Sequence, residues 1–285
     1  MGNNILSAIL NISNFKNNDL KDYSTKYLIR INAVGEQLEY YMQDAIAGTF
    51  TKKLEDKKEI YSKVFSYLGN QNNPPDLIIK KGDAIEVKKI ENKSSNIALN
   101  SSPPKDLLHS DDIRITTECR NCEGEEWKEK DLFYTVGYVK NKLIKYLFLI
   151  QGTCFSANRE IYERIHEPLK ADINELIKEK GLESGKTKEL GAVKRVDPLG
   201  ITNLRVRGMW HIQNPLSVYT DICSYGGDKN FVLFVLMLSE KYMSFPKEDR
   251  DKIESKKEIF VEDIKIKNPN NPAKLLNAKL ITFSF

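Results

Sequence analysis

Apolar positions recur with two different periods along the chain, and each period predicts a type of element. From Val34 to Ala47 they fall on one arc at helical spacing, which predicts an amphipathic helix ended by Gly48. A second helical pattern covers roughly residues 53–68. Two short apolar runs follow, at residues 77–80 and 84–90, with a Lys-Gly-Asp turn between them. These runs predict two neighbouring antiparallel strands.

The second half of the chain predicts further strands and one long helix. The runs LFYTVGYV and LIKYLFLIQG, joined by Lys-Asn-Lys, are typical of a hairpin of buried strands. Residues 159–181 have a helical pattern, with a possible break at Pro168. NLRVRGMWHIQ alternates like a strand, FVLFVLML is a buried strand or helix, and AKLITFSF is a terminal strand. This order predicts one α/β domain with a mixed sheet.

Composition and charge narrow the class of protein. The chain has 285 residues, of which 40% are hydrophobic and 29% charged, as in a soluble globular protein. Lys and Arg exceed Asp and Glu by only four, so the location of the positive charge matters more than its total. The longest apolar runs are too short to span a bilayer, and no secretory signal precedes the four cysteines. We therefore expect a cytoplasmic protein with reduced thiols and no membrane partner.

Acidic side chains interrupt the two short apolar runs. In the strand from residue 84 to 90, side chains alternate faces, so Glu86 and Lys88 share one side while Ile85 and Val87 pack on the other. Asp76 begins the preceding strand and would lie beside Glu86. Two like charges 4 Å apart cost about 4 kcal/mol at an effective dielectric of about 20. A divalent cation removes this repulsion, and oxygen ligands favour Mg²⁺.

This arrangement resembles the PD-(D/E)xK nuclease superfamily, here written Pro75-Asp76, nine residues, then Glu86-Val87-Lys88. The resemblance implies a restriction-endonuclease-like mixed β-sheet flanked by α-helices. It also implies that Asp76, Glu86 and the Val87 carbonyl hold Mg²⁺, while Lys88 stabilises charge on the attacked phosphate. A further acid from the preceding helix, which binds metal or holds Lys88, is implied, and Glu39 fits better than Glu36 because it borders the apolar arc; a helix-surface glutamate is the alternative for Glu39. An exposed edge hairpin with ordinary surface charges is the alternative.

Several segments together resemble one branch of the type II restriction endonucleases, which includes enzymes that cut GGCC. They are FSYLGNQNNPPD, GDAIEVKKIE, SSNIALNSSPPK and DPLGITNLRVRGMWHIQNP. The resemblance implies one endonuclease domain over residues 1–285, with a catalytic core at about 34–165 and a DNA-recognition part at about 186–240. It implies cleavage of double-stranded DNA at a short, palindromic, GC-rich site, giving 5′-phosphate ends. A homodimer and a cognate DNA methyltransferase are the implied partners.

A basic segment supports DNA recognition independently. Residues 186–214 hold six Lys or Arg and two acids, a local excess as large as that of the whole chain. On a strand, Asn203, Arg205 and Arg207 would share one face, and Arg reads guanine best. The alternatives are a solvated basic strand and, for His211, a structural histidine. The candidate DNA contacts are Asn203, Arg205, Arg207, His211, Gln213, Lys194 and Arg195, with Ser101, Ser102 and Lys105 on an earlier loop.

Two further motifs lack parts that their sites require, and two rival functions stay open. Cys119 and Cys122 have zinc-ligand spacing, but a complete set would need His109 or another distant group. GLESGKT is one residue short of a phosphate-binding loop and follows a predicted helix instead of a strand. A repair or junction nuclease would share the metal site without strict sequence recognition. A DNA-binding protein would use the acidic pair only structurally.

Overall fold

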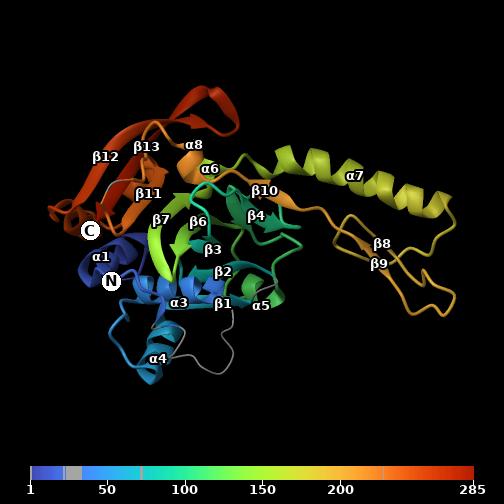
Figure 1. Ribbon diagram of the computed structural model, residues 1–285, viewed down its shortest axis with the longest axis horizontal. Coiled ribbons are helices and arrows are strands. Elements are labelled where there is room, and N and C mark those ends of the chain that lie inside the picture. Colours follow the sequence, from blue (N-terminus) through green and yellow to red (C-terminus); the bar gives the residue numbers. More distant parts are fainter. Residues whose placement is uncertain (1, 22, 24–33, 71–72, 227) are drawn as a thin grey trace.

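A mixed β-sheet crosses the molecule, with helices on its faces and one long helix projecting away from it (Figure 1). The computed structural model describes residues 2–21, 23, 34–70, 73–226 and 228–285. Within these ranges the sheet has nine strands, eight of them in one continuous path and one, β5 (Leu107–His109), paired beside β6. In sheet order the path is β1 (Phe65–Asn70), β2 (Asn73–Ile79), β3 (Ala84–Ile90), β6 (Glu129–Lys140), β7 (Leu143–Gln151), β11 (Val232–Leu238), β13 (Asn271–Ser284) and β12 (Ile259–Asn268).

The pairing directions make the sheet mixed. β3 with β6 and β7 with β11 are parallel, and the other neighbours along the path are antiparallel. Each parallel pair is joined by a long connection, as parallel strands require. The predicted α/β domain with a mixed sheet flanked by helices is therefore confirmed.

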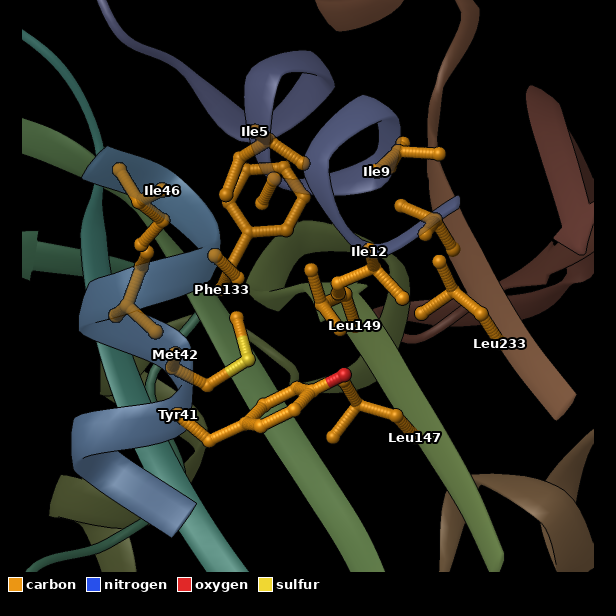
Figure 2. Close-up of a cluster of buried hydrophobic side chains, with 14 of the residues drawn as sticks. Ile5, Ile9, Ile12, Tyr41, Met42, Ile46, Phe133, Leu147, Leu149 and Leu233 are labelled. Atoms are coloured by element: carbon orange, nitrogen blue, oxygen red, sulfur yellow. The ribbon is translucent and has the colours of Figure 1, made fainter. Parts of the chain in front are cut away.

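One face of the sheet is covered by α1 (Ile5–Phe15) and α3 (Val34–Ala47), with α10 (Lys247–Glu254) beside α1. Figure 2 shows how the two helices meet over the strands. Helix α1 buries Ile5, Ile9 and Ile12, which are spaced four and three residues apart and therefore lie on one side of the helix. The side chains in contact there from α3 and the sheet are Tyr41, Met42, Ile46, Phe133, Leu147, Leu149 and Leu233.

Helix α3 approaches the sheet closely at Gly137 of β6. A Cβ on Gly137 would lie 2.6 Å from Cδ2 of Leu38, which no real contact allows. The glycine thus lets α3 sit directly on the strand beside β3. A buried carboxylate fixes the same helix from its other side, because Asp44 accepts hydrogen bonds from Tyr23, Tyr61 and Lys57. Lys57 and Tyr61 belong to α4 (Leu54–Val64), so this cluster ties α4 to α3.

The opposite face carries a second core and the short helices. Alternate residues of β7, Tyr146, Phe148 and Ile150, point into it, whereas Leu147 and Leu149 point into the first core. The helices on this side are α5 (Thr117–Arg120), α6 (Gly152–Phe155) and α8 (Pro215–Val218), and α9 (Ser239–Ser244) follows β11. A two-stranded sheet of β4 (Ile97–Asn100) and β10 (Trp210–Ile212) joins segments more than a hundred residues apart.

Residues 159–209 form an arm that extends away from the sheet (Figure 1). It consists of α7 (Arg159–Glu179) and a small sheet of β8 (Gly191–Val193) with β9 (Leu204–Val206). The two parts pack closely, since a Cβ on Gly191 would lie 2.7 Å from Cγ2 of Ile173. Helix α7 continues through Pro168, which is exposed, so water can satisfy the backbone carbonyl that loses its partner.

Several predicted elements are confirmed, and others differ for tertiary reasons. The helix at 34–47, the strand at 84–90 and the β6–β7 hairpin are confirmed. The helical pattern predicted over 53–68 ends at Val64, because Phe65, Tyr67 and Leu68 pair with β2 as strand β1. Strand β4 forms just before the loop that holds Ser101 and Ser102, and FVLFVLML is strand β11 in the middle of the sheet. Among the described helices, none combines the length and the apolar character that a membrane crossing needs.

Candidate active site

Asp76 and Glu86 meet where strands β2 and β3 stop pairing. The two strands are in register at Ile78 with Ala84 and at Leu77 with Ile85, so the next pair would be Asp76 and Glu86. Instead of continuing the ladder, Asp76 accepts a hydrogen bond from the Val87 backbone N–H through Oδ2 at 2.6 Å. The predicted neighbours on adjacent strands are thus brought together at an opening in the sheet.

The two faces of β3 serve different purposes. Ile85 and Val87 are buried in the first core against α3. Glu86 and Lys88 face the other way and line, together with Asp76, a pocket of about 190 Å³. The predicted alternation is confirmed, and its consequence is a polar pocket on a strand whose other side is fixed by the core.

The electrostatics of the pocket are dominated by its buried charges. Lys88 Nζ lies 2.5 Å from Oε1 of Glu86. Burial raises the pKa of Asp76 well above its usual value, and the nearby Glu86 charge raises it further. Burial alone would lower the pKa of Lys88, but the carboxylates of Glu86 and Asp76 outweigh it and raise that pKa. Lys88 is therefore an ammonium at neutral pH, beside carboxylates that repel each other.

The pocket fits an oxygen-preferring divalent cation. Oε2 of Glu86 is buried and has no hydrogen-bond partner among the residues that the structure describes. An orphaned carboxylate oxygen beside a second carboxylate is the donor set that a hard cation requires. The acids form a pair: over the described ranges, no three His, Cys, Asp or Glu side chains gather around one point.

Glu39 lies within electrostatic reach of this pair. Burial raises the pKa of Glu39 to about 7; Lys88 opposes the shift, whereas Glu36 and Glu86 add to it. The charges of Lys88 and Glu86 act on this carboxyl group, so Glu39 on α3 lies near the pocket that they line. Its predicted part in catalysis stays a prediction.

The loop after β4 contributes to the same pocket, with one exception. Ser101 and Ser102 line the pocket beside Glu86, and the hydroxyl of Ser102 has no hydrogen-bond partner in the described part of the chain. Lys105 is instead buried and pairs with Asp112 at 2.6 Å. Burial lowers the pKa of Lys105, against the effect of Asp112. Lys105 is therefore held in an ion pair under the loop, and its predicted phosphate contact stays a prediction.

The predicted recognition strand is divided between two small sheets. β9 pairs with β8, whereas β10 pairs with β4, and the segment from Arg207 to Met209 separates them. Leu204 is exposed, so the face of this strand opposite Arg205 is not buried against the rest of the protein at that residue. His211 is exposed on β10 and is therefore not a buried structural histidine. The exposed candidates are Lys194, Arg195, Asn203, Arg205, Arg207, His211 and Gln213.

Two of the basic residues already have acidic partners. Arg195 pairs with Glu183, and Nε of Arg207 lies 3.6 Å from Oε1 of Glu189. Arg205 lines a concave surface with Lys186 and Lys188, next to the catalytic pocket.

Sequence reasoning missed three residues of the catalytic pocket. Arg114, Lys188 and Glu189 line it together with the carboxylate pair. Arg114 follows β5, and the other two precede β8, so no local motif links them to the catalytic strands. The only available signal was the basic character of residues 186–214.

The cysteines show no sign of a metal site. All four are free, and Cys119 is buried on α5 while Cys122 is half-buried. Burial raises the pKa of both thiols, which disfavours the thiolate that zinc needs. GLESGKT lies between α7 and β8, so the strand required before a phosphate-binding loop is replaced by a helix.

Known proteins match the chain over almost its whole length. The NgoPII restriction endonuclease family matches residues 3–267. The type II restriction enzyme NgoPII of Neisseria gonorrhoeae is 43% identical over 281 residues, which cover 98% of this chain and 99% of that protein. A comparison with solved structures gave no match. The predicted resemblance is confirmed: the chain belongs to the NgoPII restriction endonuclease family and is a type II restriction endonuclease.

Proposed function

We propose that this enzyme cleaves double-stranded DNA at a short, palindromic, GC-rich site, with Mg²⁺ as its cofactor, and leaves 5′-phosphate ends. Type II restriction endonucleases generally use divalent metal ions. The observation that carries the proposal is the carboxylate pair of Asp76 and Glu86 at the opening between β2 and β3, with the Lys88 ammonium bonded to Glu86. The fit of this pair to a hard cation supports Mg²⁺.

The proposed roles follow from the chemistry of each group. Asp76, Glu86 and the backbone carbonyl of Val87 hold the metal, and Lys88 stabilises the negative charge that develops on the attacked phosphate. Bound Mg²⁺ would neutralise phosphate charge and lower the pKa of water toward neutrality. Glu39 adds a further carboxylate that holds the Lys88 ammonium in place.

The DNA would follow a basic surface from the catalytic pocket to the arm. Lys188 and Glu189 belong both to the catalytic pocket and to the concave surface that Lys186 and Arg205 line. Cations along such a track would neutralise phosphates, and Arg205 would read base edges. The remaining proposed contacts are Lys194, Arg195, Asn203, Arg207, His211 and Gln213 on the arm side, and Ser101 and Ser102 beside the pocket.

A second copy of the chain is the proposed protein partner. A two-fold symmetric dimer matches the symmetry of a palindromic site. Sixteen large apolar residues are exposed among the described residues, and ten of them lie in the arm. Such a concentration marks a protein interface more than a DNA surface. A cognate DNA methyltransferase, which would protect the host genome, is the proposed genetic partner.

Oligomeric state tests the dimer directly. Ile165 and Leu169 are each 50% exposed on successive turns of α7. In sedimentation experiments, we expect the wild type to be dimeric and Leu169→Asp to shift toward the monomer. The matched control is Leu275→Asp, which changes an exposed leucine on β13, outside the arm. A wild type that is monomeric at all concentrations, with and without DNA, contradicts the proposal.

Cleavage of plasmid DNA tests the activity. The protein is incubated with plasmid with and without Mg²⁺, and the ends of the products are sequenced. We expect discrete cuts at one short GC-rich motif, only with the metal, and 5′-phosphate ends. Ragged cuts would contradict site-specific cleavage, and cutting in EDTA would contradict the role of the carboxylate pair.

A further inference from the structure

The catalytic pocket contains a cation that the proposed mechanism does not use. Arg114 lies in the loop between β5 and α5 and lines the same pocket as Asp76, Glu86 and Lys88. Its side chain is 19% exposed, so it borders the pocket without extending into bulk solvent. A fixed cation at this position needs an explanation.

Backbone and side-chain contacts hold Arg114 by one edge. Its Nε donates to the carbonyl of Ser101 at 3.2 Å, and Nη1 lies 3.7 Å from Oδ1 of Asp112. The backbone is fixed as well, because the Arg114 N–H donates to Asp112 and Asn73 donates to the Arg114 carbonyl. Within the described residues, neither terminal nitrogen of the guanidinium donates a hydrogen bond. Those donors are available to a ligand in the pocket.

The charges next to Arg114 leave its guanidinium able to bind an anion. One carboxylate, that of Asp112, lies between two cations, with Lys105 at 2.6 Å and Arg114 at 3.7 Å. Burial raises the pKa of Asp112, but Lys105 outweighs it and lowers that pKa, so Asp112 stays ionised. Since Lys105 takes the shorter contact, the guanidinium charge is left only partly compensated. A planar guanidinium with free terminal donors is well suited to two oxygens of one phosphate.

We propose that Arg114 binds a backbone phosphate of the DNA in the catalytic pocket, through its terminal nitrogens. The inference rests on the proposed function, since it assigns a residue to the same substrate. Two phosphates could take this position, the scissile one or the adjacent one on the same strand, and they have the same chemistry.

The arm is fastened to the residue before Arg114. Lys188 Nζ donates to the carbonyl of Ile113 at 2.6 Å, whereas Asn73, three residues before Asp76, holds the carbonyl of Arg114 at 2.8 Å. Arg114 therefore lies at the junction between the arm and the catalytic strand β2. Through this junction, the position of the arm on DNA would set the position of the phosphate contact.

Substitution with a matched control tests the inference. Arg120 is a close control, because it also donates to backbone carbonyls, those of Ser110 and Asp112, and does not line the catalytic pocket. For Arg114→Gln we expect single-turnover cleavage to slow by about 10²-fold, as for loss of one transition-state donor. Arg114→Lys should recover part of the rate, since it keeps the charge but loses the fork. Arg120→Gln should cut at nearly the wild-type rate.

Modified substrates separate binding of phosphate from a structural role. After the cut site is mapped, duplexes carry a neutral methylphosphonate at the scissile or at the adjacent phosphate. If Arg114 binds the adjacent phosphate, a methylphosphonate at that position should slow cleavage by the wild type but should not slow Arg114→Gln any further. If Arg114 binds the scissile phosphate, a methylphosphonate there should weaken DNA binding by the wild type but should not weaken binding by Arg114→Gln any further. If the methylphosphonate at each position affects Arg114→Gln as strongly as it affects the wild type, the inference is wrong.

The remaining outcomes are also decisive. If the wild type cuts at discrete sites and Arg114→Gln cuts equally fast, only the assignment of Arg114 fails. If Arg114→Gln and Arg120→Gln slow cleavage equally and unfold at lower temperature, the role of Arg114 is structural and the inference is wrong. If the wild type does not cut DNA with Mg²⁺, the proposed function fails, and the assignment of Arg114 fails with it.

Discussion

In the main sheet, β7 and β11 lie side by side with almost every side chain buried, whereas the arm leaves many of its apolar side chains in solvent. Leu147 and Phe148 are 0% exposed, while Leu199 and Ile201 at the end of the arm are 82% and 77% exposed. The carboxylate pair is attached to the buried region, so its geometry is fixed by two cores. Beyond the contact between α7 and β8 within it, the arm is joined to the rest of the protein by contacts of single side chains, such as Lys188 with the Ile113 carbonyl and Arg159 with Asp111.

The difference indicates a division of work between the two regions. A phosphodiester is attacked efficiently only if the catalytic groups are held in place before the substrate arrives, which the sheet provides. Under the proposed function the arm would read DNA and contact a second copy of the chain, and such a surface must leave cations and apolar side chains exposed. The two regions meet at the catalytic pocket, where Lys188 and Glu189 of the arm lie beside Glu86.

The largest expected effect is on catalysis in the sheet. Lys88→Ala and Glu86→Ala should slow cleavage by about 10²–10³-fold or more, since the first removes charge stabilisation at the phosphate and the second removes a proposed metal ligand. DNA binding, measured by gel retardation with Ca²⁺ in place of Mg²⁺, should change little. Lys89→Ala is the control, because Lys89 is the next residue on β3 and pairs with Glu91 outside the pocket. Wild-type cleavage by both pocket variants would show that the site is elsewhere.

Next in size is the difference in stability between the core and the arm. Asp44→Ala should lower the free energy of unfolding by about 3–5 kcal/mol, because it leaves the Lys57 ammonium buried without its partner. Glu183→Ala breaks the exposed ion pair with Arg195 in the arm and should change the free energy of unfolding by less than about 1 kcal/mol. Both values come from urea unfolding. Equal losses would mean that the arm is as tightly integrated as the core.

A smaller effect is expected on recognition by the arm. Arg205→Ala should weaken binding by about 1–3 kcal/mol and relax the choice of base at one position. Lys194→Ala should instead weaken binding to all DNA sequences alike. It should also reduce the slope of log binding constant against log salt concentration by about one, the value for one phosphate contact. Binding of site libraries at two salt concentrations distinguishes the two. If both variants behave alike, Arg205 contacts phosphate and does not read a base.

The smallest effect concerns pH and Glu39. Its pKa is raised from 4.5 to about 7 in the folded protein, so its ionisation opposes folding. The penalty is absent below pH 4.5 and grows as the pH rises to about 7. In EDTA, Glu39→Gln should therefore gain stability relative to the wild type between pH 5 and pH 8. Glu59→Gln should show the opposite sign, since its hydrogen bond with Lys63 lowers the pKa of Glu59. A flat difference for Glu39→Gln would place that carboxyl in water.

Part of the candidate site was readable from the sequence because it is local. The alternation of Ala84–Ile90 determines which of its side chains face the core, and the turn before it returns the chain to Asp76. The two-residue spacing of Glu86 and Lys88 and the tight turn that leads back to Asp76 depend only on residues close together in the sequence. Asp76, Glu86 and Lys88 could therefore be predicted together. The helix that carries Glu39 was equally local in its apolar arc.

Tertiary structure alone decided the rest. Residues 65–68 have a helical pattern but pair with β2 as part of a strand, and the predicted recognition strand divides because β8 and β4 pair with separate parts of it. Lys105 became a buried ion pair, and Arg114 and Lys188 reached the pocket, through contacts between segments far apart in sequence. Such contacts depend on how all the packed surfaces fit at once. For that reason, periodicity in the sequence determined the faces of the elements, while packing decided which of them meet.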